Sequence, residues 1–232
     1  MFTARLARLN IRIDNKYDYI LRQCEGYIVP ETEKPDFCVC VTDEEIMRED
    51  TGGFEKGYLE SLAVYRKIAE KLITLNGFLL HGVILETNGV GVALLARSGT
   101  GKSTHAALWL RLLGDKCRII NGDKPLVRRI DGAFLAFGTP WAGKEGIQQN
   151  AEVPLKKVCF IERSGENSIE QTTKKSALER LCSQVYLPKN SPLMLTLIDT
   201  LDEFISECEF YIIKCNKDIS AAEVAYRGLF NE

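Results

Sequence analysis

Apolar positions in the first fifty residues follow the spacing of short strands. Two β-type runs, RLNIRI and FCVCVT, are joined through a polar loop. The stretch over residues 43–51 is acidic and is expected to form a loop. This pattern predicts a small strand-rich portion over residues 1–54.

Beyond that portion, helical and strand spacings alternate without an evident linker. Apolar residues recur at helical spacing from Tyr58 to Leu75. Asn88-Gly89 and Asp131-Gly132 each separate two β-type runs and predict hairpins. Three further segments have helical patterns, residues 103–113, 176–185 and 193–207, and Ser220 to Glu223 fit a capping box at the start of a last helix. We therefore expect an α/β main domain over residues 55–232, with a mixed β-sheet core and flanking helices.

Composition and charge argue mainly against certain classes of protein. The chain has 232 residues and a formal net charge of -2, with no basic stripe, so we expect no nucleic-acid partner. No run of about 18 apolar residues occurs, and the N-terminus lacks the apolar core of a signal peptide. These features favour a cytoplasmic protein with no membrane partner.

The eight cysteines fit the same compartment. They are scattered through apolar segments rather than packed into a short disulfide framework, and are expected to be free thiols. Cys38 and Cys40 would share one face of a strand. No second pair has zinc spacing, and the chain has two histidines, so a metal site is not expected there.

The strongest chemical signal is the stretch ARSGTGKST, from Ala96 to Thr104. It follows the phosphate-loop pattern G-x-x-x-x-G-K-[ST], with Ala96 in place of the first glycine. That alanine is tolerated if its φ angle is negative. The predicted nucleotide-binding residues are Ser98, Gly99, Thr100, Gly101, Lys102, Ser103 and Thr104. The alternative is a glycine-rich turn between a strand and a helix.

Each part of this loop has a chemical role in the nucleotide-binding interpretation. Lys102 would reach the β- and γ-phosphates of ATP, and Ser103 would hold Mg²⁺. The helix after the loop would direct its positive end at the phosphates. Asp123 ends the strand-like run CRIIN, where a carboxylate could contact the metal or accept a proton from an attacking hydroxyl. Its alternative role is that of a turn former beside Gly122.

From His81 to Asp123 the chain resembles the kinase core of HPr kinase/phosphorylase, a P-loop fold similar to the nucleotide core of phosphoenolpyruvate carboxykinases. It more closely resembles uncharacterised HPr-kinase-like proteins of anaerobic Gram-positive bacteria, over roughly residues 55–230. The shared motifs are FLLH at 78–81, SGTGKSTH at 98–105, NGDKP at 121–125, GTPWAGK at 138–144 and ERSGEN at 162–167.

The resemblance implies phosphoryl transfer from ATP, with Mg²⁺, to a hydroxyl acceptor. It gives Asp123 a catalytic or metal-binding role and places His81 near the phosphates. A buried strand histidine is the alternative for His81. Relatives usually have two adjacent aspartates, whereas this chain has Gly122 before Asp123. The signature region for dephosphorylating HPr is not visible, so HPr is not the expected acceptor.

The segment TPWAGKEG, residues 139–146, is the candidate acceptor-side loop. Lys144 could neutralise charge in the transition state, and Trp141 could stack on a base or cover the site. The alternative is an exposed turn with a buried tryptophan. The acceptor itself, whether a small molecule or a serine or threonine of a peptide or protein, is not named by the sequence.

Two other functions remain open at this point. Gly122 in place of a carboxylate suits a nucleotide-binding regulator or adaptor with weak catalysis. Residues 1–54 could also serve as the docking module of a peptide-modifying kinase in a small-peptide biosynthesis system.

Overall fold

The computed structural model describes residues 1–30 and 33–230. Its N-terminal end is a three-stranded sheet in the order β1-β2-β3, with β2 antiparallel to β1 and parallel to β3. This sheet and the helices near it are β1 (Phe2–Leu6), β2 (Leu9–Asp14), α1 (Asp18–Gln23), a 3-10 turn (Glu25–Tyr27), β3 (Phe37–Cys40), α2 (Asp43–Met47) and α3 (Lys56–Ile73). The described residues within 1–54 thus form three strands, two short α-helices and a 3-10 turn.

The prediction of a loop over residues 43–51 is wrong for its first half. Helix α2 begins at Asp43 because Thr42 and Glu45 form a capping box. The Thr42 side chain accepts the Glu45 N–H, and the Glu45 carboxylate accepts the Thr42 N–H. Two of the helix's otherwise unpaired N–H groups are satisfied in this way.

Helix α3 shares its core with the N-terminal sheet. One hydrophobic cluster contains Ile11 and Ile13 of β2 together with Leu59 and Ile68 of α3. The fully buried Glu60 of α3 accepts hydrogen bonds from the backbone N–H groups of residues 16 and 17. The proposed division after residue 54 thus falls just before a helix that packs with residues 1–54, and it stays a prediction.

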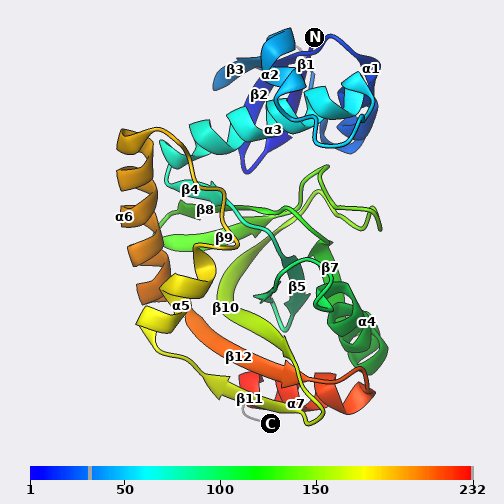
Figure 1. Cartoon of the computed structure of the whole chain (residues 1–232), viewed down its shortest axis with the longest axis vertical. Helices are drawn as coiled ribbons and strands as arrows, with labels where there is room; N and C mark the ends of the chain where they lie inside the picture. The colour runs from blue at the N-terminus through cyan, green and yellow to red at the C-terminus, as the bar shows by residue number, and fades with distance from the viewer. Residues whose placement is uncertain (31–32, 231–232) are drawn as a thin grey trace.

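The large sheet is mixed and forms the centre of the molecule (Figure 1). Its main path runs β4-β8-β9-β10-β6-β5-β7, and β12 and then β11 extend it from β10. The strands are β4 (Gly77–Leu79), β5 (Val83–Thr87), β6 (Val90–Leu95), β7 (Cys117–Asn121), β8 (Leu126–Ile130), β9 (Ala133–Phe137), β10 (Glu152–Arg163), β11 (Ser168–Gln171) and β12 (Glu209–Cys215). The expected α/β class with a mixed sheet is confirmed.

Strand β10 belongs to both halves of this sheet. Its first residues, 152–154, pair antiparallel with β9. Its later part lies between β6 and β12 and is parallel to both. The register with β6 shifts between Leu155 and Lys157, where the strand passes from one half to the other.

Helices cover the two faces of the sheet. The cluster on one face joins α5 (Lys174–Leu181) and α6 (Ser191–Glu207) to residues of β4, β9 and β10. The cluster on the other face joins α4 (Lys102–Leu113) and α7 (Ile219–Phe230) to residues of β5, β6 and β7. A short 3-10 turn (Gly114–Lys116) follows α4. Figure 1 places the N-terminal sheet with α3 at one end of the long axis and β12 with α7 at the other.

Candidate functional site

The glycine-rich loop connects the end of β6 to the start of α4. Ala96 is buried and its φ angle is not positive, as predicted for the residue that replaces the first glycine. Gly99 and Gly101 have φ angles of 75° and 127°, which side-chain-bearing residues rarely adopt. The loop therefore makes its two unusual turns at the glycines and needs no glycine at position 96.

Several backbone N–H groups at this end of α4 have no partner. The first hydrogen bond of the helix runs from the His105 N–H to the Gly101 carbonyl at 2.9 Å. Among the described residues, no backbone or side-chain acceptor lies opposite the N–H groups of Lys102, Ser103 and Thr104, and the helix has no side-chain cap. Free N–H groups and the helix dipole are the features that favour an anion at a helix N-terminus.

Arg163, at the end of β10, holds the outer part of the loop. Its Nε donates to the Thr100 carbonyl at 2.9 Å, and its Nη2 donates to the Gly99 carbonyl. These two hydrogen bonds connect the loop to the end of β10. The sequence predicts no role for Arg163, because the parallel pairing of β10 with β6 that brings it here has no local signal.

Three side chains predicted to act together lie in contact. His81 Nε2 is 3.2 Å from Asp123 Oδ1 and 3.5 Å from Lys102 Nζ. Lys102 Nζ also donates to the Ala96 carbonyl at 2.8 Å. His81 lies between β4 and β5, and Asp123 follows β7. The Gly82 N–H donates to the Asp123 carbonyl at 2.8 Å, which ties these two segments together.

The charges of this group favour an ionised carboxylate. Burial alone would raise the pKa of Asp123, but the hydrogen bond from His81 and the charges of Lys124 and Lys102 outweigh it and hold that pKa below its ordinary value. Burial lowers the pKa of Lys102, and Asp123 counteracts this. A bound anion would add a second partner for the buried ammonium group.

The 139–146 loop closes over Asp123. Its Trp141 stacks on Tyr65 of α3, with ring centroids 3.9 Å apart and an angle of 9° between the planes. Trp141 is buried, which agrees with the alternative of a buried tryptophan, and one face of its ring is covered by Tyr65. A Cβ built on Gly143, whose φ is 74°, would lie 3.0 Å from the Asp123 Cβ. The loop thus packs directly against the catalytic candidate.

Gly122 is also fixed by this loop. Its N–H donates to the Ile147 carbonyl at 3.0 Å. A Cβ at this position would lie 3.2 Å from the carbonyl oxygens of both Ala142 and Ile147. An aspartate at position 122 would therefore require the loop to move, and the glycine matches the packing of this chain.

Substituting Gly143 tests whether this packing positions Asp123. Gly143→Ala is expected to lower the free energy of unfolding by about 1–2 kcal/mol, because a residue with a side chain is strained at this positive φ. It is also expected to slow any reaction that depends on Asp123, because the new methyl group meets that side chain. Gly146→Ala is the matched control, since its φ is 62° and nothing lies within 4 Å of its Cβ. Urea unfolding and a turnover assay measure both effects. Equal turnover in the two variants would contradict the positioning role.

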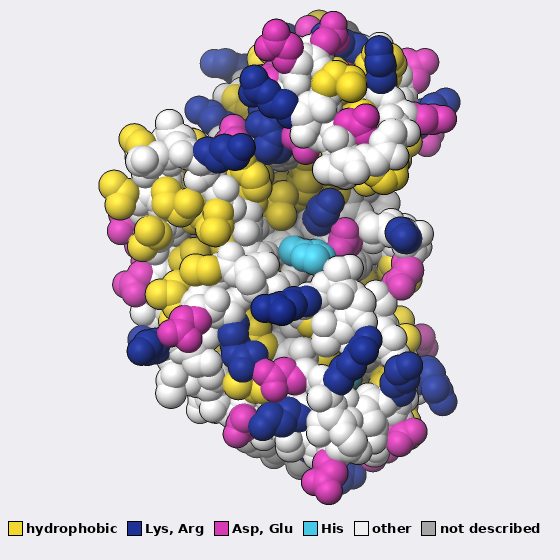
Figure 2. All heavy atoms as spheres, viewed as in Figure 1, with side chains coloured by type: hydrophobic (Ala, Val, Ile, Leu, Met, Phe, Trp, Pro, Cys, Tyr) yellow, Lys and Arg dark blue, Asp and Glu magenta, His cyan; other side chains and the backbone are white. Residues whose placement is uncertain are grey.

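All the predicted site residues except Thr100 line one cleft of about 1000 Å³. His81, Asp123, Lys144, Ser98, Gly99, Gly101, Lys102, Ser103 and Thr104 all line it. Thr100 does not, and lines a second hollow together with Arg163. Figure 2 shows the molecule hollowed below its N-terminal end, with a histidine at the centre of the hollow and cationic side chains around it.

Other predicted features are placed outside the cleft. Cys38 and Cys40 are exposed on β3, and residues 1–30 and 33–230 contain no cluster of three or more His, Cys, Asp or Glu side chains suited to a metal. His105 is buried in α4, which lowers its pKa to about 4. Over the same described ranges, no helix is long and apolar enough to cross a membrane.

Comparison with known proteins adds little to this geometry. No model of a known protein family matches the chain, and no curated protein matches it. A structure search finds the HPr(Ser) kinase/phosphatase from Coxiella burnetii, with a TM-score of 0.31 and 10% identity, covering 56% of this chain and 92% of that chain. This is a distant structural similarity, and no activity follows from it.

Proposed function

We propose that the protein is a kinase that uses ATP and Mg²⁺ to phosphorylate a hydroxyl group. The observation that carries this proposal is the set of unpartnered N–H groups at residues 102–104, beside a buried lysine and an ionised carboxylate in the same cleft. A polyphosphate chain supplies the acceptors that these N–H groups lack. Three lysines and two carboxylates line the cleft, an excess of positive charge that suits such a ligand.

The residues present also fit a magnesium ion. Mg²⁺ in nucleotide sites is held by one or two protein oxygens, with the remaining positions taken by water and phosphate. Ser103 and Asp123 offer one hydroxyl and one carboxylate in the same cleft. When bound, the ion would neutralise charge on the phosphates. Lys102 would hold the β- and γ-phosphates from the other side.

The chemical step needs little from the protein beyond position and charge. The acceptor oxygen forms a bond to the γ-phosphorus while the bond from that phosphorus to the β–γ bridging oxygen breaks, and the electron pair leaves with ADP. The hydroxyl proton passes to Asp123 or to the transferred phosphoryl group. His81 donates to Asp123 and keeps the carboxylate oriented, and Lys144 supplies positive charge at the acceptor side.

Thermal unfolding with and without Mg·ATP tests the nucleotide site. A ligand at 100 times its Kd stabilises a protein by about 2.7 kcal/mol, which corresponds to roughly 5–10 °C for a chain of this size. The wild-type protein is expected to show this shift. Lys102→Ala is expected to lose it, because the variant removes the buried cation beside the phosphate site.

Lys116→Ala is the matched control for that experiment. Lys116 is an exposed lysine at the far end of α4 and does not line the cleft, so its variant should keep the full shift. The absence of a shift in the wild type at millimolar Mg·ATP would overturn the proposal. A shift without ADP release in the presence of any hydroxyl acceptor would instead indicate a nucleotide-binding regulator.

A further inference from the structure

The cleft continues past the phosphate end into an aromatic end built by the N-terminal elements. Tyr19 of α1, Phe54, and Tyr58 and Leu62 of α3 line it together with Trp141. Tyr58 contacts both Tyr19 and Phe54, with ring centroids 5.9 Å and 5.5 Å apart. Phe54 is 53% exposed, a large apolar surface left at the rim of a cleft. This group of rings gives the end of the cleft a lining that suits a flat, apolar group.

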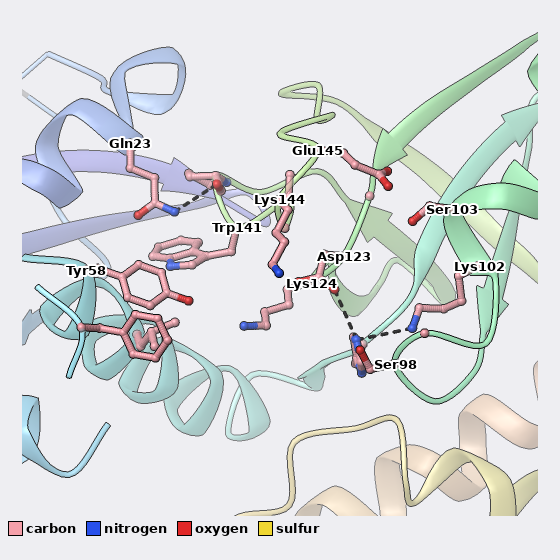
Figure 3. Close-up of a pocket in the computed structure, with 18 of the residues that line it drawn as sticks. Gln23, Tyr58, Ser98, Lys102, Ser103, Asp123, Lys124, Trp141, Lys144 and Glu145 are labelled. Carbon is pink, nitrogen blue, oxygen red and sulfur yellow. Dashed lines mark hydrogen bonds and ion pairs between the residues drawn. The ribbon is translucent and has the colours of Figure 1, made fainter. Parts of the chain in front are cut away.

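Two cations lie between the aromatic end and the phosphate end. Figure 3 shows the ammonium groups of Lys124 and Lys144 between Tyr58 on one side and Asp123 with Lys102 on the other. Neither lysine forms an ion pair with any residue that the structure describes. Lys144 is exposed in the 139–146 loop, while the Lys124 side chain is half-buried at the start of the aromatic end. An acidic group on a bound molecule would pair with Lys124.

The order of groups along the cleft decides which reactant belongs at the aromatic end. The loop N–H groups and Lys102 take the β- and γ-phosphates, and the carboxylate at the end of the next strand faces the γ-phosphate. Transfer is in line, so the acceptor approaches from the side opposite the leaving ADP. Asp123 lies between the loop and the aromatic end in Figure 3. A molecule held at the aromatic end is therefore on the acceptor side.

We propose that Tyr19, Phe54, Tyr58 and Trp141 bind the phosphoryl acceptor, a small hydroxylated molecule with a flat apolar body and an acidic group paired with Lys124. This inference rests on the proposed phosphoryl transfer, for which it names the class of substrate. The N-terminal elements thus supply acceptor specificity, while the large sheet supplies the phosphate site.

Calorimetric titration of the full-length protein with three probes tests this assignment. The probes are 4-hydroxybenzoate, which is flat and acidic, 4-hydroxybenzyl alcohol, which is flat and neutral, and gluconate, which is acidic and not flat. In the presence of Mg·ADP, 4-hydroxybenzoate is expected to bind at least about tenfold more tightly than either of the others, the factor that roughly 1.4 kcal/mol gives. Equal binding of the three, or no binding at millimolar concentration, would overturn the assignment.

Two variants separate the apolar and acidic requirements. Phe54→Ala should weaken 4-hydroxybenzoate binding about tenfold, an effect of roughly 1.4 kcal/mol, without changing gluconate binding. Lys124→Met should remove the preference for the acid over the alcohol. Met47→Ala is the matched control, because Met47 is an exposed apolar residue of the same end of the molecule outside the cleft.

Mg·ADP affinity, measured on the same samples, separates this inference from the proposed function. If Mg·ADP binds to the wild type and to Phe54→Ala alike while 4-hydroxybenzoate does not bind, the acceptor assignment fails and the nucleotide site stands. Weaker Mg·ADP binding by Phe54→Ala would place the nucleoside at the aromatic end and overturn the assignment. A serine-containing peptide that binds independently of Phe54 and Lys124 would overturn it in favour of a peptide acceptor.

Discussion

Asp123→Asn is expected to lower kcat for phosphoryl transfer by roughly 10²–10⁴-fold, the usual contribution of a positioned acid or base. The substitution keeps the size of the side chain but removes its charge, so the side chain can no longer accept a proton and would bind a metal ion more weakly. Because His81 and the nearby lysines hold the pKa of Asp123 below its ordinary value, the wild-type carboxylate stays ionised at neutral pH. Activity should therefore not fall through protonation of this group until the pH drops below the ordinary carboxylate range.

The dependence of kcat on Mg²⁺ concentration separates the two roles of Asp123. If the residue is a metal ligand, Asp123→Asn raises the Mg²⁺ concentration needed for half-maximal rate. If it is a base, that concentration stays the same while kcat falls. Glu145→Gln is the matched control, a carboxylate of the same cleft with no contact to His81 or Lys102. A variant Asp123→Asn with wild-type kcat would remove Asp123 from the mechanism.

Among the substitutions described in Results and Discussion, Phe204→Ala is expected to cost the most stability, about 3–5 kcal/mol in the free energy of unfolding. Phe204 of α6 is fully buried, and its ring centroid lies 5.2, 5.0 and 5.6 Å from those of Phe78, Phe134 and Phe210. One ring thus joins α6 to strands β4, β9 and β12, and truncation leaves a cavity at their junction. Urea unfolding measures the loss.

A control for this prediction lies on the same helix. Leu195 is 64% exposed, so Leu195→Ala removes little buried surface and should change the unfolding free energy by less than about 0.5 kcal/mol. Similar losses in the two variants would contradict the role of this aromatic junction.

Local features of the fold could be predicted because each is fixed by a few neighbouring residues. The hairpin turn after β5 is one example, since Asn88 and Gly89 have φ angles of 54° and 71°, as a two-residue turn between twisted strands requires. The second hairpin turn, at Asp131 and Gly132, and the end of α4 at Gly114 could be predicted from local sequence in the same way. The capping box that begins α2 was missed although it is also a local signal.

The arrangement of the site depended on contacts that no local pattern encodes. Arg163 reaches the glycine-rich loop only because β10 lies beside β6. Tyr65 covers Trp141 only because α3 packs beside the 139–146 loop. Tyr19 and Tyr58 reach the cleft because the N-terminal sheet and α3 share one core. The residue types of the candidate site were visible in the sequence, while the aromatic wall opposite them required the tertiary structure.

The position of β10 has a consequence for synthesis on the ribosome. Strands β6 and β9 are both complete before the first residue of β10 is made, and each then has one edge that only β10 will cover. Uncovered strand edges pair readily with other chains. The growing chain therefore carries two open strand edges between the synthesis of Phe137 and that of Arg163, and is prone to aggregation over this interval. Fragments that end before Glu152 keep both edges open permanently.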